Sequence, residues 1–420
     1  MSEFAGTAIV DPQRFKWRAL TGAILGYVFD AIDFMVLALA IPLLIKAWHI
    51  SMVQAGSIAT ATLLGAALAG YIWGPITDSW GRKKALAACL CWFGILTFLC
   101  GFAENYIQLL ILRFLAGLGL GGEWAIGGAM MTEFFPPKQR AIATSAIQSA
   151  WPVGYGLALA VAAYLVPVYG WPVLFFFGGS SLLAAVYVLL MVPESPAWLK
   201  HREEKRQGII HHYVGETGVE ETGRWTDILK GHYLKISILC TLLCASCLVS
   251  YWGAGTWIPT FLANERGLNL KAMAGYLLGI NIAGFLGYYA FGFLADRLGR
   301  RWNFIIGGVG SGIVVLIWIM MSNPQAIFWM GMVFGFISYG YWGPLAAFIS
   351  EQFPTRLRGV GVSFCYATGR MFAVLVPMIL GGVAQKYNLG IAIGCIAVVF
   401  AVGGLIAWFM KETKDAVVIG

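Results

Sequence analysis

The second half of the chain repeats a set of charged, glycine and proline residues of the first half at a constant offset of 218 residues. The segment GPITDSWGRKK, which begins at Gly74, corresponds to GFLADRLGRR, which begins at Gly292. The segment EFFPPKQRA, from Glu133, corresponds to EQFPTRLRG, from Glu351. Self-similarity at a fixed period indicates copies of one structural unit. We therefore expect two domains of the same architecture, in which a charge present in only one copy is a candidate for function.

The apolar content predicts an all-α membrane protein. Of the 420 residues, 59% are hydrophobic and 11% are charged, whereas a soluble domain carries about 25% charged residues. A helix of about 20 apolar residues spans a bilayer, and the chain contains twelve such stretches, six in each copy of the repeat. We expect spans at 19–45, 53–76, 85–103, 107–132, 141–167, 171–192, 236–262, 272–294, 303–321, 325–349, 359–384 and 390–410.

The spans and the repeat together predict five segments. These are a cytoplasmic N-terminus (1–18), an N-terminal six-helix bundle (19–192), a cytoplasmic linker (193–235), a C-terminal six-helix bundle (236–410) and a cytoplasmic tail (411–420).

The net charge of +8 is explained by its distribution along the chain rather than by nucleic-acid binding. With the N-terminus inside, 22 of the 28 Lys and Arg residues fall on the inner side, two lie within spans, and four lie in outer loops: Lys46, Arg266, Lys271 and Lys386. An excess of Lys and Arg marks cytoplasmic loops. We therefore expect a multi-pass protein of a bacterial-type inner membrane, with both termini in the cytoplasm.

The residues do not predict an enzyme, a metal site or a cofactor. No nucleophile–base pair or metal-ligand spacing is visible, and the five His residues lie in loops or at a span edge. The Gly-rich run between Gly117 and Gly122 lies inside a span with no preceding strand, so it fails the context of a nucleotide-binding loop. Small residues instead let membrane helices approach closely.

Two repeated charge pairs lie at the expected cytoplasmic ends of helix pairs. Asp78 with Arg82, and Asp296 with Arg300, have i,i+4 spacing. Such groups can clamp neighbouring helix ends through ion pairs and helix dipoles, and a clamp that breaks in one state would act as a gate. The alternative is that these charges only orient the protein in the membrane.

These motifs resemble those of the major facilitator superfamily, and the resemblance covers the whole chain. The pattern G-x-x-x-D-x-x-G-R-K/R after the second and eighth spans, Arg113 with the following GLGLGG, and VPESPAWL after the sixth span carry the likeness. The resemblance implies two bundles that rock about a central site near the bilayer midplane, with a monomer as the functional unit.

Five charges inside the spans have no counterpart in the other copy: Asp30, Asp33, Arg113, Glu123 and Arg370. An ionisable residue inside the membrane costs at least about 2.5–3.5 kcal/mol on insertion and marks a functional site by default. We therefore expect these residues, and not the repeated ones, to perform the chemistry of the protein.

The acidic members predict proton coupling. Asp30 and Asp33 are three residues apart, so they share a helix face, and two adjacent carboxylates in a low dielectric do not both ionise cheaply. Static pairing of one Asp with Arg113 or Arg370 is the alternative, and the pattern does not select the Asp that takes the proton. Glu123 is either a proton relay or a structural partner, and Arg113 either orients a carboxylate or acts in gating.

Arg370 predicts an anion site, because a guanidinium stays charged and presents a planar fork to a carboxylate or phosphate. Permanent pairing with an Asp of the first span is the alternative. Aromatic and amide side chains in mid-span positions are candidates for the wall of a cavity that suits a small organic anion. These candidates are Gln148, Trp151, Tyr251, Tyr339 and Trp342.

The first-span pattern D-A-I-D-F and the eleventh-span Gly-Arg resemble the carboxylate-handling branches of the superfamily, which carry aromatic acids, sialate and monocarboxylates. The Ala after the first Asp is closer to the sialate and monocarboxylate type. We therefore expect an importer of a small carboxylate by proton symport, with protons, the anion and the lipid bilayer as its partners. A sugar or polyol symporter, a non-transporting nutrient sensor and a proton antiporter remain as alternatives.

Overall fold

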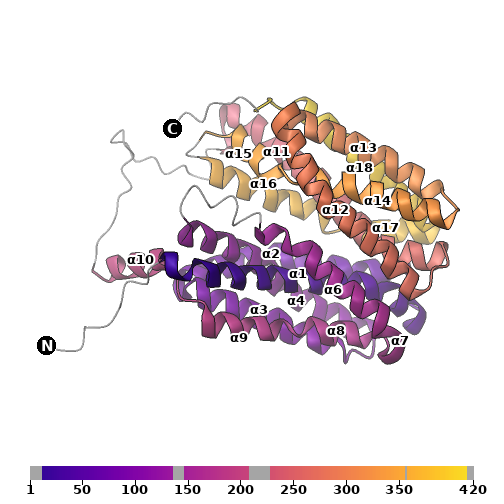
Figure 1. Ribbon diagram of the computed structural model, residues 1–420, viewed down its shortest axis with the longest axis horizontal. Coiled ribbons are helices and arrows are strands. Elements are labelled where there is room, and N and C mark those ends of the chain that lie inside the picture. The colour runs from indigo at the N-terminus through magenta and orange to yellow at the C-terminus, as the bar shows by residue number, and fades with distance from the viewer. Residues whose placement is uncertain (1–11, 136–145, 208–227, 355–356, 414–420) are drawn as a thin grey trace. The chain divides into compact units, whose positions relative to one another are not determined.

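A computed structural model (Figure 1) describes residues 12–135, 146–207, 228–354 and 357–413. Every regular element in these ranges is a helix, and twelve helices are long and apolar enough to cross a membrane. The predicted all-α class and the number of spans are therefore confirmed. The start of the predicted span 141–167, residues 141–145, lies outside the described residues. The chain divides into two compact units, one with residues 1–40 and 61–211 and one with residues 41–60 and 212–420. The five predicted segment boundaries stay a prediction.

The helices of the first half are α1 (Pro12–Trp48), α2 (Met52–Trp80), α3 (Arg82–Cys100), α4 (Tyr106–Phe134), α6 (Ala150–Tyr164), α7 (Val166–Tyr169), α8 (Pro172–Gly178), α9 (Ser181–Met191) and α10 (Pro196–Arg206). The end of α1 and the start of α2 belong to the second unit. Helix α10 is short and charged and lies within the predicted linker.

The second half contains α11 (Gly231–Thr260), a π-helical turn η2 (Phe261–Glu265), α12 (Leu270–Leu298), α13 (Arg300–Met320), α14 (Pro324–Gly340), α15 (Leu345–Gln352), α16 (Arg358–Ala373), α17 (Val376–Lys386) and α18 (Leu389–Trp408). The eleventh span is interrupted between α16 and α17. Pro377 explains the interruption, because its ring nitrogen has no hydrogen to donate to the carbonyl of Ala373.

The two units repeat the same helix pairing. Helix α3 packs against α8 and α9 in the first unit, as α13 packs against α18 in the second. Helices α2 and α4 cross closely, because a Cβ on Gly117 would overlap the carbonyl oxygen of Thr62. The equivalent Gly335 lies against the carbonyl of Ile280 where α14 crosses α12. The predicted close packing at the Gly-rich run is confirmed.

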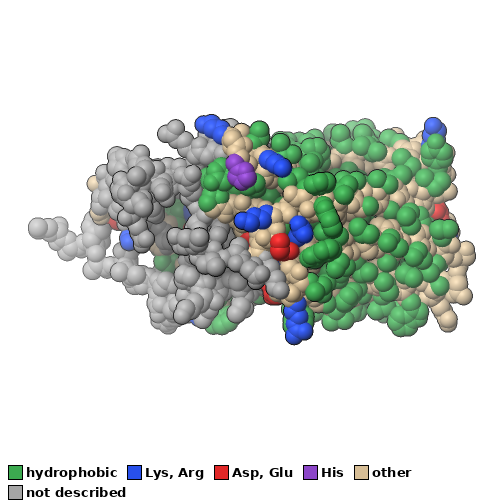
Figure 2. All heavy atoms as spheres, turned by 90° about the horizontal axis from the view of Figure 1, so that it is seen from above, with side chains coloured by type: hydrophobic (Ala, Val, Ile, Leu, Met, Phe, Trp, Pro, Cys, Tyr) green, Lys and Arg blue, Asp and Glu red, His purple; other side chains and the backbone are tan. Residues whose placement is uncertain are grey.

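Apolar side chains cover much of the described surface. Leu190 is 76% exposed and Leu183 is 71% exposed, which would be costly in water but suits lipid. On the face shown in Figure 2, charged side chains gather beside the grey residues, a few more lie at the right-hand end, and apolar side chains fill the band between them. This distribution is the one expected of helices that cross a bilayer.

Candidate functional site

A buried ion pair joins α1 to α4 in the first unit. Asp33 Oδ1 lies 2.6 Å from Arg113 Nη1, and both side chains are fully buried. A buried charge is tolerated when it is paired and its remaining hydrogen-bonding groups are satisfied. The two unmatched charges therefore compensate each other within one unit.

Two threonines, on α3 and α2, form hydrogen bonds with the side chains of this ion pair. Thr97 of α3 donates its hydroxyl hydrogen to Asp33 Oδ2 and accepts a hydrogen bond from Arg113 Nη1 at 3.2 Å. Arg113 Nε donates to Thr62 Oγ1 of α2 at 3.3 Å. Side chains from four helices thus meet in one polar cluster, which we call the Asp33–Arg113 cluster. The contacts with Arg113 and Thr97 limit the movement of the Asp33 side chain.

Sequence reasoning did not select the two threonines, although the repeat contained the signal. Thr62 corresponds to Ile280 in the second copy, and Thr97 corresponds to Val315. Both are polar residues that the other copy replaces with an apolar one. Extending the comparison of the copies from charged to all polar residues would have identified them.

A second buried acidic pair lies nearer the start of α1 and further along α4. Glu123 is 0% exposed, and neither of its carboxylate oxygens has a hydrogen-bond partner among the described residues. Its Oε1 lies against Gly26, where a Cβ would be only 2.5 Å away. Asp30, one helical turn after Gly26 and 4% exposed, interacts with Glu123 electrostatically. The structure therefore places Glu123 beside Asp30, and Arg113 beside Asp33.

The predicted cavity residues of the fifth span have different surroundings. The ring centroid of Trp151 lies 5.4 Å from that of Tyr27 and 6.1 Å from that of Phe34, so α6 packs against α1 through aromatic rings. Gln148 precedes α6 and is exposed. The amide of Gln148 and the indole of Trp151 are therefore not part of one described contact.

Three predicted aromatic residues meet in the second unit. The ring centroid of Tyr251 in α11 lies 5.5 Å from that of Tyr339 in α14 and 5.4 Å from that of Trp342. The phenol of Tyr288 in α12 lies in the neighbourhood of those of Tyr339 and Tyr366. These residues form one aromatic cluster with hydroxyl groups, a composition that suits the lining of a site for a small organic molecule.

Arg370 lies in the last turn of α16, just before the interruption of the eleventh span. Its guanidinium carbon lies 5.4 Å from the ring centroid of Tyr366, one turn earlier on the same helix. No carboxylate of the described residues forms an ion pair with it. Free carbonyl groups at a helix C-terminus stabilise a cation, so the helix break helps to accommodate this guanidinium inside a span.

Two glutamates at equivalent positions of the repeat, Glu194 and Glu412, each cap the start of a helix that lies 112 residues earlier in the chain. Glu194 Oε1 accepts hydrogen bonds from the backbone N–H groups of Arg82, at 2.8 Å, and Lys83, at 3.2 Å. These are the first residues of α3, whose free N–H groups bind carboxylates. Gly81 precedes them with φ 95° and lies directly against the carboxylate, so only a glycine fits without strain or overlap.

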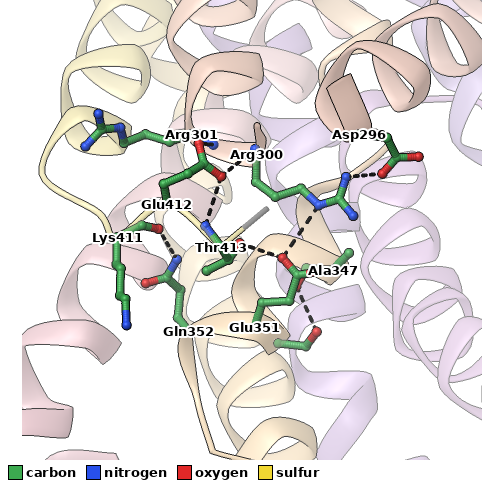
Figure 3. A network of polar contacts seen from close by, with 10 residues as sticks. Asp296, Arg300, Arg301, Ala347, Glu351, Gln352, Lys411, Glu412 and Thr413 are labelled. Carbon is green, nitrogen blue, oxygen red and sulfur yellow. Dashed lines mark hydrogen bonds and ion pairs between the residues drawn. The ribbon is translucent and has the colours of Figure 1, made fainter. Parts of the chain in front are cut away.

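The second copy reproduces this cap (Figure 3). Glu412 Oε1 accepts from Arg300 N at 2.8 Å, and its Oε2 accepts from Arg301 N at 3.2 Å. Gly299 has φ 112° and lies against the same carboxylate. The backbone N–H of Thr413 donates to Glu412 Oε1 at 2.9 Å. The repeated Gly-Arg motif therefore shapes a helix start that receives a glutamate from another helix end.

The arginines of the motif also bind the repeated acidic residues after the fourth and tenth spans. Arg82 Nη2 lies 3.1 Å from Glu133 Oε1, and Arg300 Nε lies 3.5 Å from Glu351 Oε2. Arg300 also pairs with Asp296 (Figure 3), whose side chain is 69% exposed. Glu351 is the less exposed of the two partners of Arg300, with 26% of its side chain accessible. The side chain of Asp78 lies outside the described residues.

Comparison with known proteins agrees with this architecture. The profile of the Major Facilitator Superfamily matches residues 23–290 and 271–419. A cis,cis-muconate transport protein of Acinetobacter baylyi is 31% identical over 402 residues, 95% of each chain. The niacin transporter NiaP of the same organism is 27% identical, over 87% of each chain. The sialic acid transporter NanX of Escherichia coli is 27% identical, over 93% of this chain and 92% of the relative.

Solved structures support the same fold. A partially occluded, inward-open xylose transporter XylE from Escherichia coli has a TM-score of 0.77 at 17% identity, over 96% of this chain and all of that one. A bacterial homologue of the lysosomal transporter Spinster has a TM-score of 0.71 at 19% identity, over 96% of this chain and 94% of that one. The family match, the twelve helices and the duplicated motif agree: the chain is a membrane transporter, not an enzyme, and belongs to the major facilitator superfamily.

Proposed function

We propose that the protein imports a small organic carboxylate together with protons, through alternating access of its two bundles. The observation that carries this proposal is Arg370, a permanently charged group inside a span with no carboxylate partner among the described residues. Arg370 is half-buried, and its planar, permanently charged fork suits the carboxylate of a substrate. The relatives named for muconate, niacin, benzoate and sialic acid, which are acids, support a carboxylate as that anion.

The substrate would bind through its carboxylate at Arg370, with its apolar body against aromatic side chains. Tyr251, Tyr339 and Trp342 are the candidates on the second unit, and Gln148 and Trp151 are the candidates on the first. Aromatic faces bury the organic part of a ligand, while a few polar groups fix its orientation.

Protons would enter at the buried carboxyl groups of the first unit, Asp30, Asp33 and Glu123. Acidic groups inside a membrane helix are typical of proton pathways in transporters. Substrate and proton together would make the loaded site nearly neutral, and a neutral site reorients across the bilayer at lower cost than a charged one.

The repeated motif would act in gating. Arg113, through its pair with Asp33, would fix the first helix. The clamps at Asp78 and Arg82, and at Asp296 and Arg300, would stabilise one conformation more than the other. A clamp shifts a two-state equilibrium only by the difference between its interaction energies in the two states. Glu133 and Glu351 belong to this proposed gate as well, because they form ion pairs with Arg82 and Arg300.

The proposed setting is the plasma membrane of a bacterium, with both termini and the 193–235 linker in the cytoplasm and a monomer as the transporting unit. The Lys and Arg asymmetry of the loops supports this orientation, and the bacterial origin of the relatives supports the membrane.

A sugar or polyol symporter is the second candidate, because the xylose transporter shares the fold. A neutral substrate leaves Arg370 uncompensated, which favours the acid. Binding separates the two: thermal shift of the purified protein with benzoate, cis,cis-muconate, niacin, gentisate, sialic acid and xylose, at two pH values. We expect stabilisation by at least one acid and none by xylose. Stabilisation by xylose alone would contradict the proposal.

A further inference from the structure

The first unit contains two buried acidic sites, one paired with a cation and one not. At the Asp33–Arg113 cluster, a guanidinium and a threonine hydroxyl satisfy the carboxylate. At Glu123, the described residues offer neither a cation nor a hydrogen-bond donor to either oxygen. Arg113 is ten residues earlier on α4, about 15 Å along the helix axis. The helix that carries both residues therefore separates a compensated carboxylate from an uncompensated one.

An ionised carboxylate without a partner is too costly to bury, so such a group takes up a proton instead. Glu123 is fully buried, and Gly26 leaves room for its carboxyl group directly against α1. Among the described residues, the titratable groups that face Glu123 are Asp30 of α1 and Cys89 of α3. The Cys89 thiol donates to the carbonyl of Gly119 at 2.8 Å, and it supplies no positive charge.

We propose that Glu123 holds the coupled proton and exchanges it with Asp30, while the Asp33–Arg113 pair stays ionised and fixed throughout the cycle. This inference rests on the proposed function and narrows its three acidic candidates to one exchanging pair. No hydrogen bond joins Glu123 to Asp30 among the described contacts, so a water molecule carries the proton between them. The O–H bond of the Glu123 carboxyl breaks as an O–H bond forms on the water, and the water gives up one of its own protons to form an O–H bond on the Asp30 carboxylate. Asp30, at 4% exposed, then passes the proton to water, and the reverse sequence reloads Glu123.

Infrared difference spectroscopy of the purified protein tests the protonation without any substrate. We expect the carbonyl band of a protonated carboxyl group at neutral pH, lost in Glu123→Gln and retained in Asp30→Asn. The matched control is Glu104→Gln, the same substitution at an exposed glutamate, which should retain the band. Persistence of the band in Glu123→Gln, its loss in Asp30→Asn, or its absence from the wild type would overturn the proposal.

Transport in proteoliposomes tests the coupling, with labelled cis,cis-muconate as the probe. Glu123→Gln imitates a permanently protonated carboxyl group, so we expect loss of accumulation driven by a pH gradient and retention of counterflow exchange, which needs no net proton movement. Retained accumulation would overturn the role in coupling, and loss of counterflow in a protein of normal thermal stability would indicate a substrate-binding role instead. If the wild type moves none of the acids in the binding panel, the proposed function fails, while the infrared comparison still decides the protonation of Glu123.

Discussion

Asp33 and Arg113 form a fully buried ion pair, so we expect the protein to be destabilised when either residue loses its partner. Removing one member of a buried pair leaves an uncompensated charge and costs about 3–5 kcal/mol. We expect Arg113→Met and Asp33→Asn each to lower the thermal stability strongly. The double variant buries no charge at this position, so its loss of thermal stability should be clearly smaller than the sum of the losses of the two single variants. Thermal unfolding in detergent measures the cycle, and additive losses would contradict the ion pair.

Arg370 has a different role, and substitution should separate its charge from its shape. Lys keeps the charge but loses the planar fork, so we expect Arg370→Lys to weaken binding of the stabilising acid while the thermal stability without ligand stays near that of wild type. Thermal shift with and without ligand measures both quantities. An equal loss of ligand-free stability would mean that Arg370 has a structural partner.

At the same scale, the sequence identified the charged residues but not how they pair. The i,i+3 spacing of Asp30 and Asp33 predicts one pair of carboxyl groups on a helix face. In the structure Asp33 contacts Arg113 and Thr97, whereas Asp30 lies near Glu123. The rotation of α1 about its axis and the register of α4 determine these partners, and neither is encoded in residue spacing.

At the scale of helices, the shared glutamate cap gives matched predictions in the two units. Loss of a capping side chain costs about 0.5–2 kcal/mol, so Glu194→Ala and Glu412→Ala should each lower the thermal unfolding temperature modestly. Gly81→Ala should cost more than replacement of Gly70 by Ala, because Gly81 has φ 95° and lies against Glu194, whereas nothing lies near Gly70. Equal effects of the two glycine substitutions would contradict the requirement for Gly81.

The crossing of α2 and α17 in the second unit gives another prediction about helices. A Cβ on Gly56 would overlap the carbonyl oxygen of Pro377, and a Cβ on Gly381 would overlap that of Met52. Trp257 Nε1 also donates to the Pro377 carbonyl, at 2.9 Å. Overpacking a close contact costs about 1–3 kcal/mol, so Gly56→Leu should disfavour the conformation in which these helices touch.

Cross-linking measures this shift. The Cβ position of Gly382 lies 3.8 Å from Val53 Cγ2, so cysteines introduced at these two positions are near enough for a disulfide. We expect efficient formation of the cross-link in the otherwise unchanged protein and a reduced yield when Gly56→Leu is added, as measured by mass spectrometry of the joined peptides. Gly275→Leu, at a glycine with open space around it, is the control. An unchanged yield of the cross-link would show that Gly56→Leu does not separate α2 from α17.

For the whole molecule, the 218-residue repeat and the apolar stretches predicted the helices, their number and their duplicated pairing. These features follow from local hydrophobicity and from chain symmetry, which a single sequence displays. The grouping of residues 41–60 with the second unit is not visible in the repeat or in the apolar stretches. Contacts such as that between Gly56 and Pro377 join segments far apart in the chain, and no periodicity of the sequence reveals them.

The energetics of the whole cycle follow from the number of acidic groups that exchange protons. If only the Glu123–Asp30 pair exchanges, one proton accompanies each substrate, and a monocarboxylate crosses without net charge. A membrane potential acts on net charge, at about 2.3 kcal/mol per elementary charge per 100 mV. Benzoate uptake into proteoliposomes should therefore rise when the outside is made acidic, fall to the level of equilibration when a protonophore is added, and stay unchanged when a potassium gradient with valinomycin imposes a potential. Stimulation by an inside-negative potential would require a second proton and would return Asp33 to the coupling site, and a gain on making the outside alkaline would mean antiport.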